Sequence, residues 1–403
     1  MVYVINKDGN PLMPTDRHRK VRLWLKNGEA KIVRHRPFTI QLLFKTGNRV
    51  QDLRFGMDPG YANVGISVIS EKREYFRAEV ELRTNISKLI TERKMYRRSR
   101  RQRNTRYRQS RFLNRKKSGV IGATDGKRKA IPQSLEHKVL SHQKLVALAK
   151  KILPLKEVCV ERNSFDMHKM KNPDVSGVLY QQGEQFGYEN TKAYVLARDK
   201  HTCYFQKGCD DTLHVHHIIF RSHQGSDAPS NLITLCEKHH DLLHEGKVSL
   251  GKIEHQSYKE ATAMNLVRSQ LFRLLPEAKE TFGYITKAKR LELKLEKSHS
   301  NDAFVIAGGT TQIRAPLTMM AFKRKNNRCL QLNRDGHKPS IRRQRYPLQP
   351  KDLVRWNSKI YRVKGTQNYG AYVLLDDGAE KPSPKAIKKV ELVFHEKTLY
   401  VVD

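Results

Sequence analysis

Residues 213–244 read LHVHHIIFRSHQGSDAPSNLITLCEKHHDLLH and hold more imidazole side chains than any other stretch of this length in the chain. Of the 17 histidines in the protein, seven fall within this stretch. Histidine is the commonest metal ligand and the usual general base near neutral pH. The stretch therefore predicts a reaction centre. Its histidines are His214, His216, His217, His223, His239, His240 and His244.

The charge of the chain indicates what this centre acts on. Lys and Arg number 78 and Asp and Glu 40 among 403 residues, a formal net charge of +38. Such a charge opposes compaction unless an anionic polymer neutralises it, and phosphate contacts release condensed counterions from nucleic acid. A merely solubilising surface is the alternative, but it needs a net charge of only about 2–8. We expect a nucleic-acid-binding protein of about two to four domains.

Cysteine usage and the amino-terminal residues indicate a location. The five cysteines form no dense framework of the secreted type, and three flank the histidines, which favours a reducing cytoplasm and a metal site over disulfides. Residues 1–10, MVYVINKDGN, lack the basic and then apolar order of a signal peptide. No run of about 18 apolar residues is present. We therefore expect a cytoplasmic protein with no membrane partner.

Alternating apolar residues and turn signals predict a small β-rich unit over residues 1–53. Its apolar runs are VYVINKDGNPLMP, RLWLKNGEAKIV and FTIQLLFKTGNRV, with hairpin-type turns at Asp8-Gly9 and Asn27-Gly28. Residues 53–70 read as paired strands. Beyond about residue 317 the chain is first basic and turn-rich and then strand-like, in KDLVRWNSKIYRVKG, GAYVLLDDG and KKVELVFHEKTLYVV, and this ending suggests a small β-barrel.

Two further elements lie between these blocks. Residues 134–152 have the apolar period of a helix. The short run VCVE that follows reads as a buried strand ending in Glu161.

Residues 93–117, RKMYRRSRRQRNTRYRQSRFLNRKK, contain 13 Lys or Arg and no acid. No Pro or Gly interrupts them and Arg is a good helix former, so they predict a long helix that is basic on almost every face. A coiled-coil or membrane-surface helix would keep an apolar stripe. A solvated charge run is the remaining alternative, but like charges repel. We predict contacts to RNA or DNA phosphates. The arginines concerned are Arg93, Arg97, Arg98, Arg100, Arg101, Arg103, Arg106, Arg108, Arg111 and Arg115.

The histidine stretch can build a metal centre with a separate base. If VHHII is a strand, His216 and His217 point to opposite sides. His240 and His244, four residues apart in a helix predicted for EKHHDLLH, share one face. His216, His240 and His244 can then hold one divalent cation, while His217 stays free to take a proton from water. A cation plus a base is what phosphodiester hydrolysis requires.

These residues resemble the HNH, or ββα-metal, nuclease family, whose pattern is a His pair, an Asn and a helical His, often with another His four residues later. The resemblance implies that His217 is the general base and that His216 and His240 are metal ligands, with His244 as a third. Asn231 is implied to orient the loop or to touch the metal. A non-catalytic histidine-rich loop is the alternative.

Members of this family often carry a zinc knuckle around the same core. Cys203 and Cys209 precede the His pair, and Cys236 and His239 form a C-x-x-H arm. Four such ligands suit tetrahedral zinc. The first arm departs from the family pattern, because five residues separate its cysteines instead of two. Buried cysteines without metal are the alternative.

A second set of acids is scattered along the chain. Asp58 lies in RFGMDPG, Glu161 ends VCVE, and SHSNDAFVIA places His299 and Asp302 three residues apart on one helical face. Singly, each acid is weak evidence, since a strand-end Asp is usually a turn residue. Together, three carboxylates could hold two divalent ions about 3.5–4 Å apart for an in-line displacement.

The order of these pieces resembles the IscB family, whose members carry a RuvC nuclease of RNase H-like fold split in three, with an HNH domain inserted. Asp58 lies in the first piece, Glu161 in the second, and His299 with Asp302 in the third. Residues 10–14, NPLMP, contain the Pro-Leu-Met-Pro signature of the first IscB domain.

The resemblance implies an α/β multidomain protein that binds a noncoding guide transcript, the omega RNA, and cuts double-stranded DNA as a monomeric ribonucleoprotein using Mg²⁺ or Mn²⁺. The HNH centre would cut the guide-paired strand and the RuvC centre the displaced strand. The implied parts are an amino-terminal PLMP domain (1–53), RuvC parts (54–92, 119–180 and 253–316), an arginine-rich bridge helix (93–118), the HNH domain (181–252) and a target-adjacent-motif domain (317–403).

Two other classes of protein remain open from the sequence. A protein-only HNH endonuclease of homing or restriction type accounts for residues 181–252 but leaves the basic helix and the scattered acids without a role. A non-catalytic RNA-binding protein accounts for the charge alone.

Overall fold

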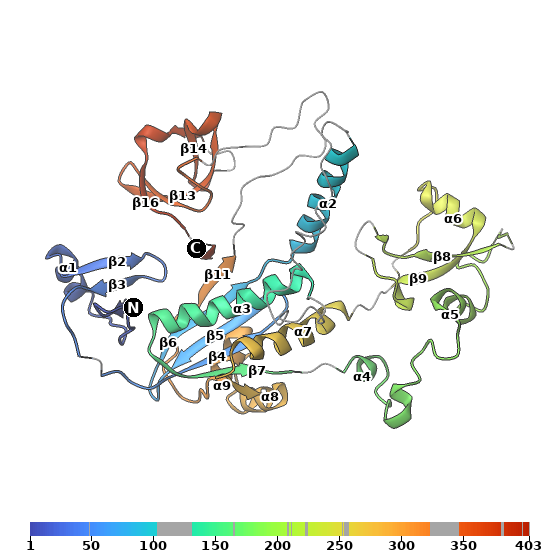
Figure 1. Cartoon of the computed structure of the whole chain (residues 1–403), viewed down its shortest axis with the longest axis horizontal. Coiled ribbons are helices and arrows are strands. Elements are labelled where there is room, and N and C mark those ends of the chain that lie inside the picture. Colours follow the sequence, from blue (N-terminus) through green and yellow to red (C-terminus); the bar gives the residue numbers. More distant parts are fainter. Residues whose placement is uncertain are drawn as a thin grey trace, which may run out of the picture. The chain divides into compact units, whose positions relative to one another are not determined.

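A computed structural model describes residues 1–47, 49–102, 131–163, 166–207, 209–210, 212–221, 225–251, 253, 258–322, 346–379, 383–396 and 398–402. The chain divides into two compact units. The first joins Met1–Asn163 to Leu266–Asp403, and the second is Ser164–Asn265 (Figure 1). None of the helices in these described ranges is long and apolar enough for a membrane crossing.

A seven-stranded mixed sheet is the largest sheet of the first unit, with the order β10-β7-β4-β5-β6-β11-β17. Strands β4, β5 and β6 pair antiparallel, whereas β7 runs parallel to β4 and β10 parallel to β7. The predicted strand pair over residues 53–70 is confirmed. The strands are β4 (Leu53–Pro59), β5 (Asn63–Ile69), β6 (Glu74–Glu81), β7 (Leu155–Glu161), β10 (Lys279–Thr281), β11 (Thr318–Phe322) and β17 (Leu399–Val401).

Side-chain alternation places Asp58 and Glu161 on the same face of this sheet. Apolar residues of β4 and β7 point into the main core, together with residues of helices α3 (Gln133–Ile152) and α7 (Lys259–Leu274), so the intervening residues face the other way. Met57 pairs with Val160 across the parallel strands, and the two acids follow directly. The carboxyl ends of neighbouring strands therefore present both carboxylates together. The core residues of these strands are Leu53, Phe55, Met57, Val158 and Val160.

Helix α9 (His299–Ile306) packs on this acid-bearing face because two glycines let its backbone approach. A Cβ on Gly56 would lie 2.1 Å from the Ala303 carbonyl oxygen, and one on Gly65 would lie 1.8 Å from that of His299. Ser298 caps the helix, since its hydroxyl accepts a hydrogen bond from the Asn301 amide at 3.1 Å. Close packing and this cap together fix the first turn of α9 beside the ends of β4 and β5.

The amino-terminal residues form a smaller mixed sheet of order β1-β3-β2 and one helix. The sequence indicated strands throughout RLWLKNGEAKIV, but its first part is helical. Val21, Trp24 and Leu25 have helical spacing and pack into a separate small core. The predicted hairpin at Gly28 is instead the helix end, where this residue adopts φ +72°. The elements are β1 (Tyr3–Ile5), α1 (His18–Lys26), β2 (Ala30–Arg34) and β3 (Thr39–Leu42).

The basic segment is helical where the structure describes it. Helix α2 (Ile86–Gln102) begins seven residues before the predicted start at Arg93. Arg93, Arg97 and Arg98 are exposed, as contacts to a polyanion require, and Arg100 and Arg101 belong to the same helix. The remaining predicted arginines, Arg103, Arg106, Arg108, Arg111 and Arg115, lie outside the described residues.

Near the carboxyl end, an antiparallel sheet of order β15-β14-β13-β12-β16 has a core of its own. The prediction of one small β-barrel beyond residue 317 is corrected, because β11 and β17 pair with each other and extend the large sheet along β6. Met320 and Leu399 join the main core there, which gives these strands a buried face. The elements are β12 (Leu353–Trp356), β13 (Lys359–Gln367), η4 (Asn368–Gly370), β14 (Tyr372–Asp376), β15 (Pro384–Ala386), η5 (Ile387–Lys389) and β16 (Glu391–Phe394).

The second unit is built around a two-stranded hairpin and a helix (Figure 1). Strand β8 (Leu213–His217) pairs antiparallel with β9 (Leu232–Cys236), and helix α6 (Glu237–His244) follows at once. The predicted helix at EKHHDLLH is confirmed, and the predicted strand at VHHII is confirmed as far as His217, since β8 starts two residues earlier and ends before Ile218. The other elements are α4 (Met167–Lys171), η1 (Gly177–Tyr180), α5 (Thr191–Arg198) and η3 (Pro229–Asn231).

Candidate metal centres

Three imidazoles converge between β8 and α6. His216 leaves the strand, while His240 and His244 lie one helical turn apart on α6. The ring centroids are 5.2 Å apart for His216 and His240, 4.9 Å for His216 and His244, and 4.6 Å for the helical pair. One nitrogen from each ring lies within 4.8 Å of the others. The spacing that the sequence suggested therefore closes into one group, which we call the imidazole trio.

The electrostatics of the trio suit a divalent cation. Burial, and then the neighbouring rings of His240 and His244, lowers the pKa of His216 to about 4. A neutral imidazole is the form that coordinates metal. The Nδ1 atom of His216 is buried and has no hydrogen-bond partner within the described residues. A buried nitrogen without a partner is costly, and a cation at this group would satisfy it.

His217 points away from the trio, as strand alternation requires. Its Nε2 atom lies 2.7 Å from Oδ1 of Asp227, and the Nε–H of Arg221 donates to the same oxygen at 2.8 Å. The Arg221 guanidinium, and then His217, holds the pKa of Asp227 below its ordinary value. Sequence reasoning missed both partners. The signal available for Asp227 was a carboxylate in the loop between the His pair and Asn231.

Asn231 is fully buried and its side chain fixes the loop between β8 and β9. Its Oδ1 atom accepts from the Ile219 amide at 2.9 Å. Its Nδ2 atom donates to the carbonyls of Ile219 at 3.0 Å and Ser226 at 2.8 Å. Of the two roles that the resemblance implied, these contacts favour orientation of the loop.

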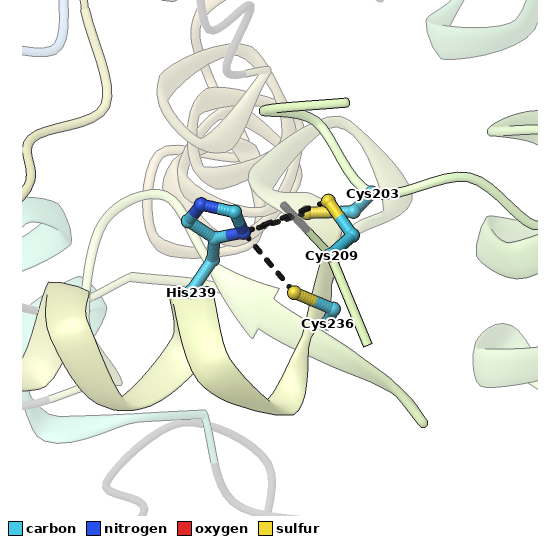
Figure 2. A group of neighbouring side chains, drawn as sticks. All are labelled: Cys203, Cys209, Cys236 and His239. Atoms are coloured by element: carbon cyan, nitrogen blue, oxygen red, sulfur yellow. Dashed lines mark hydrogen bonds between the residues drawn. The ribbon is translucent and has the colours of Figure 1, made fainter. Parts of the chain in front are cut away.

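A second group in this unit joins three cysteines and one histidine (Figure 2). The sulfurs of Cys236, Cys209 and Cys203 lie 3.1, 3.6 and 3.7 Å from one atom, Nδ1 of His239. Cys203 and Cys236 are buried and Cys209 is exposed. All four ligand atoms lie within 4.8 Å of one another, so the five-residue spacing of the first arm does not prevent the cysteines from meeting. We call this group the Cys/His quartet, and its donors fit a tetrahedral metal ion.

In the first unit, each scattered acid has a specific partner. Asp58 Oδ2 lies 2.6 Å from Nδ1 of His299. The Arg290 guanidinium donates to both oxygens of Asp302, at 2.7 and 2.9 Å. Glu161 Oε1 accepts from Asn163 Nδ2 at 2.7 Å. Asp58, Glu161, His299 and Asp302 together are called the acid centre below.

Burial and mutual repulsion act on the acid centre together. Burial, then the charge of Asp58, raises the pKa of Glu161 to about 7, and Asp302 adds to this effect. Burial also raises the pKa of Asp302, again with a contribution from Asp58. The hydrogen bond to Asp58 raises the pKa of His299. Carboxyls that lie more than a hundred residues apart in the chain thus influence one another's protonation. Carboxylate ligands of a cation site do the same until a bound cation offsets their negative charge.

The acid centre is looser than the other two groups. In the described part of the chain, the groups with three or more ligand atoms within 4.8 Å are the Cys/His quartet and the imidazole trio. Asp302 is paired with Arg290, and Asp58 with His299.

Two arginines that sequence reasoning missed compensate this charge. Arg268 of α7 is buried, and its guanidinium donates to the carbonyls of Pro59 at 3.0 Å and Asn163 at 3.2 Å, which ties the end of β4 to the residues after β7. Arg290 lies on helix α8 (Gly283–Glu292). No motif marks either residue, because their function depends on where α7 and α8 pack.

Helix α8 presents one face to the acid centre. Gly283, Thr286 and Arg290 follow the i, i+3, i+7 spacing of a helical face. The Gly283 amide donates to Asn163 Oδ1 at 2.7 Å, the Thr286 hydroxyl bonds to Glu161, and Arg290 binds Asp302. Helix α8 is therefore the outer support of the carboxylates.

Comparison with known families agrees with this arrangement. Residues 201–246, which include the strand pair, the buried loop Asn and the helix with its histidines, match the family model described as HNH endonuclease, and this match supports a nuclease domain. Residues 2–183 match the model described as RRXRR protein, and the sequence reads RRSRR at 97–101. Both domains are features of IscB-type proteins. No curated protein matches the chain.

Proposed function

We propose that this protein is an RNA-guided endonuclease of IscB type that cuts both strands of DNA at two separate, metal-dependent centres. The observation that carries the proposal is the acid centre, because an HNH endonuclease acting alone has no use for carboxylates gathered at the ends of β4 and β7 and at α9. The net charge of +38 and the exposed arginines of α2 support a large nucleic-acid partner beyond the substrate.

At the HNH centre, the roles follow from the contacts of His217. When Asp227 accepts the proton of Nε2–H, the lone pair of the neutral ring lies on Nδ1, which is the atom that takes a proton from the attacking water. Arg221 shares the carboxylate and so holds Asp227 in place. A divalent cation bound by His216, His240 and His244 supplies stabilisation of the negative charge on the scissile phosphate. Asn231 keeps the loop that carries Asp227 closed.

At the acid centre, Asp58, Glu161 and Asp302 are the proposed ligands of Mg²⁺ or Mn²⁺, since carboxylate oxygens suit these hard cations. His299 holds a proton against Asp58 Oδ2, and Arg290 balances Asp302 until cations bind. The mixed sheet with acids at its strand ends supports the RuvC-like reading of this part of the chain. The Cys/His quartet is proposed to hold structural zinc.

Strand-labelled cleavage by the purified ribonucleoprotein tests the two-centre proposal. His217→Ala is expected to leave only the cut in the displaced strand, and Asp58→Ala only the cut in the guide-paired strand. Asp52→Ala, which removes an exposed acid just before β4, is the matched control and should leave both cuts. Loss of both cuts from either active-site change would contradict independent centres.

The guide is tested separately by sequencing RNA that co-purifies with the protein from cells that hold its native locus. One abundant species encoded beside the gene is the expected result. Sequence-specific cleavage by RNA-free protein would instead support an endonuclease of homing type.

A further inference from the structure

Two aromatic rings flank Gly283, the first residue of α8, which is hydrogen-bonded to Asn163 beside Glu161 of the acid centre. Phe282 and Tyr284 are 44% and 73% exposed, although burial of such rings is normally favourable. Their centroids are 6.0 Å apart and their planes lie within 14° of parallel. The two rings thus form the beginning of a stack that ends in solvent.

The position of this pair is fixed by Gly283 between them. The Gly283 amide donates to Asn163 Oδ1 at 2.7 Å, and Asn163 Nδ2 donates to Glu161 Oε1 at 2.7 Å. A Cβ on Gly283 would lie 2.2 Å from Asn163 Nδ2, so a side chain there would break the contact. Two hydrogen bonds therefore connect the aromatic pair to a carboxylate of the acid centre.

The surface beside the rings suits a polyanion. Lys287 and Lys289 are exposed on the same helix, three and five residues after Tyr284. Exposed aromatic rings next to cationic side chains are the combination with which proteins bind single-stranded nucleic acid, since bases stack on the rings and the cations follow the backbone. A duplex offers no free base face, so the arrangement selects unpaired strands.

We propose that Phe282 and Tyr284 form a stacking platform for an unpaired base of single-stranded DNA, which positions the neighbouring phosphodiester at the acid centre. This inference rests on the proposed function, because it gives the acid centre a single-stranded substrate. The base continues the stack on the exposed ring of Tyr284, and Lys287 contacts the backbone.

A double-mutant cycle, in which a protein substitution is combined with an abasic site in the substrate, tests the platform. Tyr284→Ala in the guided complex should lower kcat/KM for the displaced-strand cut by about fivefold to a hundredfold, the range of one base–aromatic stack. Single abasic sites scanned across the cut region should include one position that causes a similar loss in the wild type. At that position, Tyr284→Ala should cause no further loss. The proposal would be overturned if Tyr284→Ala caused no loss of kcat/KM. It would also be overturned if the losses from Tyr284→Ala and from the abasic site multiplied, as independent effects do.

Two variants control for loss of structure. Tyr284→Phe keeps the ring and should retain the wild-type rate. Leu291→Ala removes an apolar side chain that is 62% exposed farther along the same helix and should change nothing. The guide-paired cut should be the same in all of these proteins.

Fluorescence separates the platform from the proposed function. If Asp58→Ala leaves the displaced-strand cut intact, the acid centre is not a nuclease, and the platform is then tested by binding alone. A single-stranded oligonucleotide carrying 2-aminopurine should be quenched by the wild type and not by Phe282→Ala/Tyr284→Ala. Equal quenching by both proteins would overturn the platform, whatever the acid centre does.

Discussion

Glu161→Gln should stabilise the magnesium-free protein above neutral pH. Burial and the charges of Asp58 and Asp302 raise the pKa of Glu161 from its ordinary value of 4.5 to about 7. Between these values the folded state keeps a proton that the unfolded chain releases, so the free energy of unfolding falls as pH rises. A difference of about 2.5 in pKa corresponds to about 3 kcal/mol. Glutamine carries no charge, and its amide oxygen can still accept from Asn163.

Denaturation of wild type and Glu161→Gln at pH 5 and pH 8 measures this effect. In magnesium-free buffer the variant should be more stable by about 3 kcal/mol at pH 8, and the difference should shrink towards pH 4.5. Hydrogen exchange of the backbone amides in β4 and β7 measures the stability of the first unit separately from that of the second. Chelators are avoided because they would also strip a bound zinc ion. Added Mg²⁺ should then stabilise the wild type but not the variant.

Glu157→Gln on the same strand is the matched control. Glu157 pairs with Lys279 at 2.9 Å, and that hydrogen bond lowers its pKa. This substitution should therefore give no stabilisation at pH 8. If Glu161→Gln is no more stable than the wild type at pH 8, neither burial nor the neighbouring carboxylates raise the pKa of Glu161 in the folded state, and the proposed cation site among these acids loses its support.

Three further predictions concern the second unit. Cys236→Ser should lose the bound zinc, measured by mass spectrometry, and should lower the melting temperature of this unit. Cys159→Ser, outside the Cys/His quartet, should do neither. Equal zinc content in the two variants would count against the site. Asp227→Asn should slow the guide-paired cut about tenfold, because the neutral amide holds His217 less firmly, and leave the displaced-strand cut unchanged; equal slowing of both cuts would show a general defect. Asn231→Ala removes three buried hydrogen bonds and should destabilise the unit by about 2–4 kcal/mol in denaturant titrations, and an effect below about 1 kcal/mol would show that the loop closes without them.

The histidine stretch shows which parts of the site the local sequence can predict. The strand and helix periods alone predicted that His216 faces away from His217 and that His240 and His244 share a face, because these relations depend only on residues a few positions apart. The trio and the Cys/His quartet then close over short loops. Asp227 escaped prediction, since its contact with His217 depends on the path of the loop that Asn231 holds.

The acid centre depended on tertiary structure. Sequence alone marked Asp58 and Glu161 as residues at strand ends, but only the parallel pairing of β4 with β7 places them side by side on one face. The close approach of α9 over Gly56 and Gly65 brings His299 to Asp58. Arg268 and the pair Phe282 and Tyr284 lie more than a hundred residues from Asp58 and Glu161 in sequence, and Arg290 lies on a different helix from Asp302, so no periodicity could connect them. Local spacing determined the imidazole trio, whereas sheet order and helix packing decided which distant charges meet.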